Sequence, residues 1–569
     1  MKYQVADTTA LSQEMIDAYG TVLAKLLHNR VVTSLEEAEE FLKVDYTTQL
    51  HDPMLLHDME LAVERILQAI EKQEKIVIYA DYDSDGIPGA VVLHDFFTKI
   101  GFLNFYTHIP HRHYDGFGLK VEALEKLLEA EQPDLVITID CGVSDLEAAD
   151  FLKRKKVDLI ITDHHEPKDT LPKAVAVVNP KCGDTYPFTE LCGAAVIFKV
   201  VQAILLQNRF DVPKGYEKWW LDMVGIATIA DMVPLHGENR VLAYYGLQVL
   251  KKTRRPGLQH LLRKQRLNPI YLTEDDIGFT IGPRINAASR MDTPEDAFLL
   301  LSVQDESEAG AVVSRLESLN TKRKTEVAKM TRSLHSTIEL IEHVPEVIVF
   351  GNPDWRPSLV GLAANKLAEE YSRPVFIWGR DGNDAHKGSC RSGGESSVIT
   401  LMEAAAEIFK EYGGHHFSGG FTVHDDFLPF FEKRMNEAFV ALGEEAAIKE
   451  PVVVDIKVTP SELTTTLLRE QKKCAPFGCA NKKPLYAIDG AKVSSVQGFG
   501  KQKEHTKLLV ENIPLTKEAI SFFSTPDSFF TIPEAGKEYM LLVHIEESYF
   551  MNRMQTRLRI VDVMPLSFL

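Results

Sequence analysis

The sequence of 569 residues has few cysteines, and none is placed to hold zinc or to form a redox pair. Its six cysteines include no C-x-x-C pair. Long apolar runs are also missing, because the most apolar segment, 194–206, is too short to span a bilayer and contains Lys199. The first ten residues show no charged-then-apolar pattern of a signal peptide. We therefore expect a cytoplasmic protein in a reducing compartment, without a membrane partner.

The sequence also lacks an excess of basic residues. It has 63 lysines and arginines against 82 aspartates and glutamates, a formal net charge of −19. This balance excludes a protein that binds nucleic acid through positive charge over its whole surface. It still allows an acidic cleft filled by metal ions, with basic residues clustered locally.

The chain is too long for one hydrophobic core, because cores stop growing at about 250–300 residues. Short apolar runs alternate with helical patterns after a helical lead, which is typical of a parallel sheet covered on both faces. We predict an α/β protein that ends in short strands typical of a small OB-like β-barrel. The predicted parts are a helical lead at 1–70, a parallel-sheet domain at 71–240, a helical connector at 241–345, a second α/β domain at 346–445 and the barrel at 450–569.

Acidic and imidazole side chains follow three of the predicted parallel strands. The segment "DYDSDG" follows the first, Asp140 follows another, and "TDHHEP" ends a third. Ligands bind beyond the carboxyl ends of such strands, so these side chains are expected to meet at one edge. A calcium-binding EF-hand is excluded for "DYDSDG", because its twelfth position is Val92 rather than glutamate.

A site rich in carboxylates with few imidazoles suits manganese or magnesium better than zinc or copper. Enough carboxylates are present for two ions, and two-ion sites are the usual device for in-line displacement at phosphorus. Taken alone, Asp140 is equally a turn residue and Asp231 equally a helix end, so the weight of each comes from the other acidic strand ends.

The second α/β region has motifs suited to an anion. The segments "HKGSCRSGGE" and "YGGHHFSGGF" contain glycine pairs, whose backbone N–H groups can approach a phosphate closely. Arg391 can hold a phosphate with two parallel hydrogen bonds. Each motif alone is weak, since glycine pairs are often only turns.

The order of these motifs resembles the DHH phosphoesterase superfamily and, within it, is similar to the RecJ family of single-strand-specific exonucleases. The similarity runs from about residue 35 to the end and includes "LCGAAVIFK", "GPRINAASRM" and "PFGCANKKP". The sequence departs from the family at "WRPSLVG", where Arg356 and Ser358 replace a histidine and a glycine, and in the extra His111 and His113. These departures spare the acidic motifs and leave open the grip on substrate, the polarity and the length preference.

The resemblance implies roles for particular residues. Metal ligands would be Asp81, Asp83, Asp85, Asp140, His164 and Asp231, with Asp140 bridging two ions. His165 would join Asp83, Asp85, Asp140, His164 and Asp231 in catalysis, by contacting the scissile phosphate or protonating the leaving oxygen. Substrate would be bound by Arg284, Asn286, Arg391, Ser392, Gly413, Gly414 and His415.

The resemblance also implies a fold and an activity. The parts after the lead would be a DHH catalytic domain, the connector, a DHHA1 domain and an OB-like domain that gathers single-stranded DNA by stacking and charge. The implied enzyme is a 5′→3′ exonuclease dependent on Mn²⁺ or Mg²⁺ that releases 5′-mononucleotides in DNA repair and recombination. A monomer is expected, with a helicase and a single-strand binding protein as partners.

Two other functions are compatible with the DHH motifs. One is a DHH phosphodiesterase acting on short RNA, cyclic dinucleotides or pyrophosphate, and the connector and barrel count against it. The other is a non-catalytic DHH scaffold in a replication complex. A scaffold has no reason to keep the cluster of Asp83, Asp85, Asp140, His164 and Asp231.

Overall fold

The first lobe is built on a five-stranded parallel sheet with the strand order β3-β2-β4-β5-β6. Its strands are β2 (Ile76–Ala80), β3 (Phe105–His108), β4 (Leu135–Ile139), β5 (Asp158–Thr162) and β6 (Ala176–Val178). The computed structural model describes residues 3–291, 293–380, 385–393, 396–443, 451–550, 553–566 and 568. The parallel sheet is as predicted, although the short strand β6 was not recognised in the sequence.

Both faces of this sheet are covered, which explains the continuous apolar runs of its strands. Ile76 and Ile78 pack on one face and Val77 and Tyr79 on the other. The first face carries α3 (Met59–Glu71), α4 (Gly86–Lys99) and α7 (Gly193–Leu206), and the second carries α5 (Val121–Glu131) and α6 (Leu146–Lys155).

The register of the central strands places their carboxyl ends side by side. Ala80 pairs with Ile139, and Ile139 pairs with Thr162. The ladder continues one residue further, because Asp81 N donates to Ile139 O and Asp140 N donates to Thr162 O. The acidic residues that follow the three strands therefore start from adjacent backbone positions.

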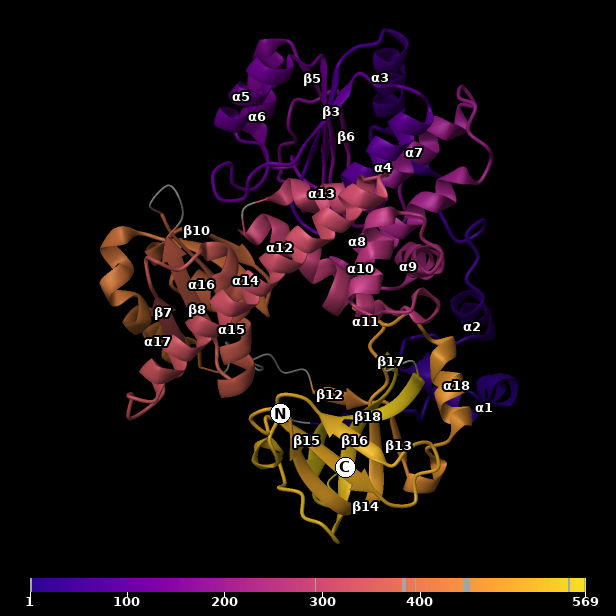
Figure 1. The fold of residues 1–569 in the computed structure, drawn as a ribbon, viewed down its shortest axis with the longest axis vertical. Coiled ribbons are helices and arrows are strands. Elements are labelled where there is room, and N and C mark those ends of the chain that lie inside the picture. Colours follow the sequence, from indigo (N-terminus) through magenta and orange to yellow (C-terminus); the bar gives the residue numbers. More distant parts are fainter. Residues whose placement is uncertain are drawn as a thin grey trace.

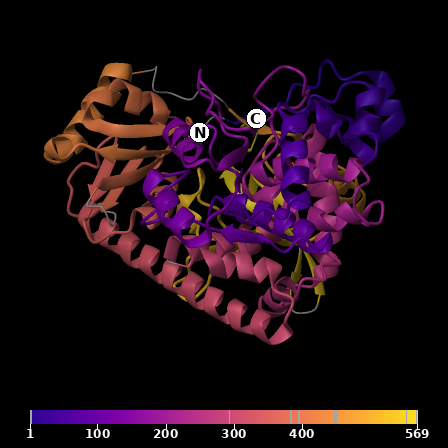
Figure 2. The ribbon, with the colours of Figure 1, turned by 90° about the horizontal axis from the view of Figure 1, so that it is seen from above.

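A helical connector joins this lobe to the second. Helix α8 (Leu221–Ala230) closes the first lobe and α9 (Gly237–Leu250) leads into the connector, which contains α10 (Pro256–Lys264), α11 (Glu274–Asp276), the π-helix η4 (Ile277–Ile281), α12 (Gly282–Met291), α13 (Pro294–Ser302) and α14 (Glu306–Ile338). Helix α14 has 33 residues, and Asp305 caps its first turn by accepting from Glu308 N. Figure 2 shows α14 running from the connector to the second lobe, which agrees with the predicted long polar helix.

The second lobe has a mixed five-stranded sheet with the order β10-β11-β9-β8-β7, in which only β7 and β8 run parallel. The strands are β7 (Ile348–Gly351), β8 (Val375–Arg380), β9 (His386–Arg391), β10 (Phe409–Gly414) and β11 (Ser418–Val423). The helices of this lobe are α15 (Pro357–Tyr371), α16 (Val398–Ala404) and α17 (Phe431–Leu442).

The C-terminal strands close on themselves. The order is β13-β14-β15-β16-β18-β17, and an additional pairing of β14 with β17 completes the ring. The strands are β13 (Ile456–Val458), β14 (Tyr486–Phe499), β15 (His505–Val510), β16 (Glu518–Ser521), β17 (Glu538–Phe550) and β18 (Arg553–Met564), with helix α18 (Thr465–Lys473) beside them. Figure 1 shows this barrel below the other two lobes.

The helical lead is divided between two lobes. Helices α1 (Gln13–His28) and α2 (Leu35–Leu42) bury their apolar faces on the barrel core, and β1 (Tyr3–Val5) pairs with β12 (Val452–Val454). Helix α3 packs instead on the first sheet. The sequence shows the apolar faces of these helices but not which sheet each one covers. The domain limits stay predictions, and the one at 445–450 lies outside the described residues.

None of the helices in the described ranges combines the length and the apolarity needed to cross a bilayer.

Candidate metal centre

The acidic loop between β2 and α4 holds its carboxylates through backbone amides. The two Asp85 carboxylate oxygens accept from Gly193 N at 2.6 Å and from Ala194 N at 2.7 Å. These amides begin α7, so the positive end of that helix faces the Asp85 carboxylate. Asp83 accepts from Asp85 N and Gly86 N, which fixes the turn into α4.

Asp140 lies at the centre of the site in an uncommon backbone conformation. Its φ is 63°, in the left-handed region that a non-glycine residue rarely adopts and that often marks a functional site. The side chain is buried against the start of α7, where a Cβ on Gly193 would lie 2.5 Å from Asp140 Cβ. The glycine in "LCGAAVIFK" is therefore required by the close approach of Asp140.

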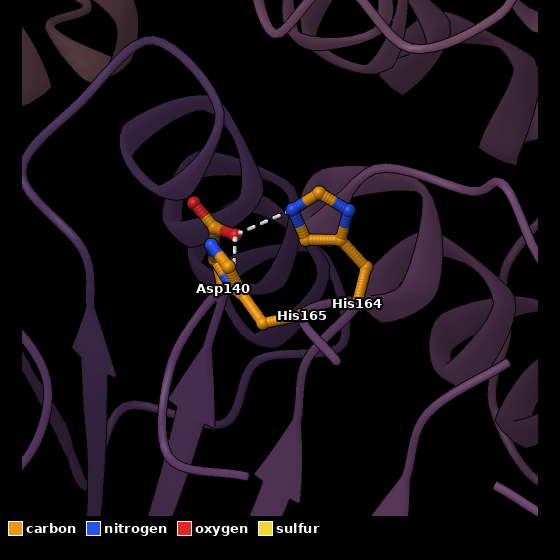
Figure 3. A group of neighbouring side chains, drawn as sticks. All are labelled: Asp140, His164 and His165. Atoms are coloured by element: carbon orange, nitrogen blue, oxygen red, sulfur yellow. Dashed lines mark ion pairs between the residues drawn. The ribbon is translucent and has the colours of Figure 1, made fainter. Parts of the chain in front are cut away.

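In the triplet Asp163, His164 and His165, the aspartate holds the loop and the two histidines face the acidic cluster. The Asp163 carboxylate accepts from Val143 N, from His164 N and from His165 Nδ1, the last at 2.8 Å. The Asp163 carboxylate therefore uses its hydrogen bonds to hold the loop. His164 Nε2 lies 3.2 Å from Asp140 Oδ1, and Figure 3 shows Asp140 with both imidazoles beside it.

The predicted metal and catalytic residues form one cluster. Ligand atoms within 4.8 Å of one another occur in three overlapping groups. The groups are Asp85, His164 and Asp231; Asp140, His164 and His165; and Asp81, Asp83 and Asp140. Asp140 and His164 each belong to two groups, which suits neighbouring ions, and the bridging role of Asp140 stays a prediction.

Burial and mutual repulsion perturb these carboxyl groups strongly. Burial, reinforced by Asp85 and Asp83, raises the pKa of Asp140 well above its ordinary value. Burial and the charge of Asp83 raise the pKa of Asp85 to about 7. Burial and the charge of Asp85 raise the pKa of Asp231 to about 9. Burial and the neighbouring His165 lower the pKa of His164 to about 4, so this imidazole is neutral.

A divalent cation fits this set of groups. Asp81 Oδ1 and Asp140 Oδ1 are buried and accept no hydrogen bond from the described residues. Clustered carboxylates with unused lone pairs repel one another, and a bound dication reverses that repulsion. The oxygen-rich set with a neutral imidazole matches Mn²⁺ or Mg²⁺.

His165 differs from His164 in its charge. Burial lowers its pKa, but the hydrogen bond to Asp163 and the nearby carboxylates outweigh burial and raise the pKa to about 9. Its side chain is 46% exposed, and its ring packs edge-on against Phe117 at 5.6 Å between centroids. A protonated imidazole therefore stands at the rim of the acidic cluster.

Four arginines gather beside the cluster. Burial and the charges of Arg112, Arg323 and Arg391 lower the pKa of Arg290 to about 9. Within the described ranges none of the four forms an ion pair with a carboxylate. Arg290 donates to Ser358 O at 2.6 Å, and the Arg112 guanidinium lies 4.9 Å from the centre of the Tyr82 ring. Uncompensated guanidinium groups at this density favour a bound anion such as phosphate.

A cleft of about 500 Å³ separates the first two lobes at this point. The first lobe lines it with Tyr82, Arg112 and Phe117, and the second lobe lines it with residues that include Lys387 and Tyr412. Sequence reasoning missed Arg112, Arg290 and Arg323. Arg290 was visible in "GPRINAASRM", but nothing in the sequence shows that these side chains converge.

The structure places the predicted substrate residues in different surroundings. Asn286 is at the site, since its amide donates to Ser84 Oγ and its carbonyl accepts from Ser84 N. Arg284 is not brought to the cluster, because it is buried and bonded to Glu317 and Gln265. Ser392 N donates to Phe417 O. Gly413 and Gly414 end β10 opposite Gly420 and Gly419, and His415 N donates to Ser418 O. The substrate roles of these residues stay predictions.

Three family models match the chain. They are the DHH family N-terminal domain at 75–228, the DHHA1 domain at 344–441 and the RecJ OB domain at 454–562. The single-stranded-DNA-specific exonuclease RecJ of Bacillus subtilis is 33% identical over 549 residues, covering 95% of this chain and 67% of that protein. The chain belongs to the RecJ family. The Escherichia coli protein of the same name is 28% identical, over 85% of each chain.

Solved structures of the RecJ family agree with the fold. The crystal structure of Thermus thermophilus RecJ with Mn²⁺ has a TM-score of 0.81 at 24% identity and covers all of this chain and 80% of that one. A structure of exonuclease RecJ bound to manganese has a TM-score of 0.57 at 31% identity, over 67% of this chain and 94% of that one. The predicted family and the predicted fold class are confirmed.

Proposed function

We propose that this RecJ-family chain is an exonuclease that hydrolyses single-stranded DNA from the 5′ end and releases 5′-mononucleotides. The observation that carries the proposal is the buried cluster of carboxylates and imidazoles beside an arginine-lined cleft. Mn²⁺ or Mg²⁺, as two ions shared among the three overlapping groups, would neutralise the carboxylates and activate a water for attack on phosphorus.

The residues of the first lobe would hold the ions and the attacking geometry. Asp85 is oriented by the amides of α7, and His164, which faces Asp140, would be a neutral nitrogen ligand. Asp163 positions both histidines without entering the ligand set. Preorganised side chains of this kind lower the barrier because they need not rearrange as charge develops.

His165 is suited to the leaving group. Its Nδ1 is occupied by Asp163, which leaves Nε2 for the substrate. Release of a 5′-mononucleotide breaks the bond between phosphorus and the 3′ oxygen of the terminal nucleotide. His165 Nε2 would donate its proton to that oxygen, or hold the scissile phosphate while water does so.

The second lobe and the arginines would grip the strand. Arg112, Arg290, Arg323 and Arg391 come from the first lobe, α12, α14 and β9, so a phosphate among them ties these elements together. The ring of Phe117 and the half-exposed Tyr412 in the cleft offer surfaces for bases. The barrel would gather the rest of the strand by stacking and charge.

The cellular setting follows from the same family resemblance. We infer a role in DNA repair and recombination, a cytoplasmic location, a monomeric protein, and cooperation with a helicase and a single-strand binding protein. The OB domain and connector favour long strands over the short RNA or cyclic dinucleotides of other DHH enzymes.

The test uses labelled substrates. The protein with Mn²⁺ is given 5′-labelled or 3′-labelled single strands, duplex DNA, short RNA and pyrophosphate, and each reaction is repeated with EDTA. Release of labelled mononucleotide at once from 5′-labelled single strands, and only late from 3′-labelled ones, supports the proposal. Turnover of pyrophosphate or dinucleotides without degradation of long DNA would contradict it, and inactivity on every substrate would favour a scaffold.

A further inference from the structure

The segment 271–291 contacts the barrel, the first lobe and the second lobe. At its start the Tyr271 ring stacks on Tyr549 of β17, with centroids 5.0 Å apart. Asp275 pairs with Lys483 at 2.6 Å, just before β14. At its end Asn286 bonds to the acidic loop and Arg290 bonds to the second lobe. Figure 1 shows α11 above the barrel and α12 near the junction of the other two lobes.

This segment presents one continuous stripe to the outside. Phe279 is exposed, Pro283, Asn286 and Arg290 are partly buried, and the four follow each other at spacings of four, three and four. Such spacing keeps side chains on one face of a helix. The opposite face is anchored, since Ile277, Ile281, Ile285 and Ala288 are fully buried. The stripe therefore leads from the barrel side to the metal centre.

Phe279 is the unusual member of the stripe. It is 80% exposed, although single exposed aromatic residues are ordinary on protein surfaces. Two further observations separate it from that background. It lies on the π-helix η4, a conformation that occurs frequently at functional sites. It also shares its helix face with Asn286, which bonds to Ser84 of the acidic loop, and with Arg290, which bonds to Ser358 of the second lobe.

We propose that Phe279 is a stacking residue for one base of the DNA strand that runs between the barrel and the metal centre. The inference rests on the proposed single-strand exonuclease function. Asn286 lies seven positions after Phe279, an axial distance of about 10 Å. That length corresponds to about three stacked nucleotides. A phenyl ring there contacts any base, because every base has a π-face, and holds the strand without sequence preference.

The consequence is a dependence on substrate length. A dinucleotide ends before it reaches Phe279, whereas a 20-nucleotide strand passes over it. Replacing Phe279 by Ala raises KM for the long strand by roughly tenfold, which corresponds to the usual worth of one base–aromatic stack. F279W keeps an aromatic surface and restores the low KM. Neither change touches a metal ligand or the buried face of the helix.

The experiment measures kcat and KM with Mn²⁺ on a 5′-phosphorylated dinucleotide and on a 20-nucleotide strand for wild type, F279A and F279W. The matched control is L103A, because Leu103 is 75% exposed and lies between α4 and β3, at the opposite edge of the sheet from the site. A second readout is 2-aminopurine fluorescence in EDTA, with the probe moved one position at a time from the 5′ end.

We expect F279A to have a raised KM on the long strand alone and L103A to have an unchanged KM. We also expect F279A to lose the quenching of 2-aminopurine at one internal position, and F279W to keep that quenching. Equal KM values for wild type and F279A on the long strand overturn the inference while leaving the exonuclease intact. Failure of the wild-type protein to degrade either substrate overturns the proposed function, and the inference with it.

Discussion

Replacing Asp140 by Asn is expected to inactivate the enzyme and yet to stabilise it when no metal is present. Asp140 is buried, and its Oδ1 accepts no hydrogen bond within the described residues. The substitution therefore removes a repelled charge while it keeps the shape of the side chain. Most core substitutions destabilise, so the sign of this effect is diagnostic of an unneutralised acidic cluster.

The magnitude follows from the geometry of the cluster. Ligand atoms of Asp81, Asp83 and Asp140 lie within 4.8 Å of one another. At that distance two like charges repel by about 3 kcal/mol at an effective dielectric constant of about 20. Relief of one such repulsion raises the unfolding midpoint of the first lobe by about 6–12 °C, given about 2–4 °C per kcal/mol for a domain of this size.

The effect depends on pH in a defined direction. Burial and neighbouring carboxylates raise the pKa of Asp85 to about 7 and that of Asp231 to about 9. When the pKa of a carboxyl group is higher in the folded protein than in the unfolded chain, the group contributes full stability below its pKa in the unfolded chain, near 4. That contribution is lost as the pH rises toward and through the pKa in the folded protein. The metal-free wild type therefore loses stability between about pH 4 and pH 9, and the gain from D140N grows over that window.

The assay is differential scanning calorimetry in EDTA at pH 5 and pH 8, repeated at pH 8 with Mn²⁺. D140N should unfold at a higher temperature than wild type at pH 8, with little difference at pH 5. With Mn²⁺ the order should reverse, because only wild type gains binding energy. D211N, at an exposed carboxylate outside the cluster, serves as the control. A D140N protein that is no more stable than wild type in EDTA at pH 8 refutes the reasoning.

Three other substitutions or deletions have clear expectations. R290A should raise KM for single strands about tenfold or more, since a charged hydrogen bond contributes about 1.5–3 kcal/mol; an unchanged KM excludes Arg290 from the phosphate site. D163N should lower kcat and move the basic limb of the pH profile to lower pH, because loss of the Asp163 carboxylate lowers the raised pKa of His165; an unaltered profile removes His165 from proton transfer. Deleting 449–569 alone should cause aggregation, because α1 and α2 lose the barrel core that they cover. Deleting both 1–45 and 449–569 should give a soluble enzyme that cleaves short strands and binds long ones weakly. A stable protein after the single deletion contradicts the observed packing of α1 and α2.

The clustering of the candidate metal ligands could be predicted because it follows from local sequence patterns. Parallel strands appear as apolar runs, and the residues that follow them must meet at one edge, so Asp85, Asp140 and His164 were identified without coordinates. The exact register that brings Asp81 beside Asp140 needed the structure.

Contacts between distant segments could not be predicted in this way. Arg112, Arg290 and Arg391 are separated by more than a hundred residues at each step, and only the packing of the connector and the second lobe against the first lobe brings them together. Arg284, to which the resemblance gives a substrate role that stays a prediction, also has a partner from a distant segment. The structure pairs it with Glu317 of α14, a carboxylate that the motif around Arg284 does not contain.

The most direct test of the metal centre is the number of Mn²⁺ ions bound by wild type and by D140A, counted by isothermal titration calorimetry and compared with the cleavage rate of single-stranded DNA. Asp140 belongs to two of the overlapping ligand groups, so its loss should abolish tight binding at both positions together with cleavage. Unchanged stoichiometry and affinity in D140A, or cleavage that persists without Asp140, would contradict the account.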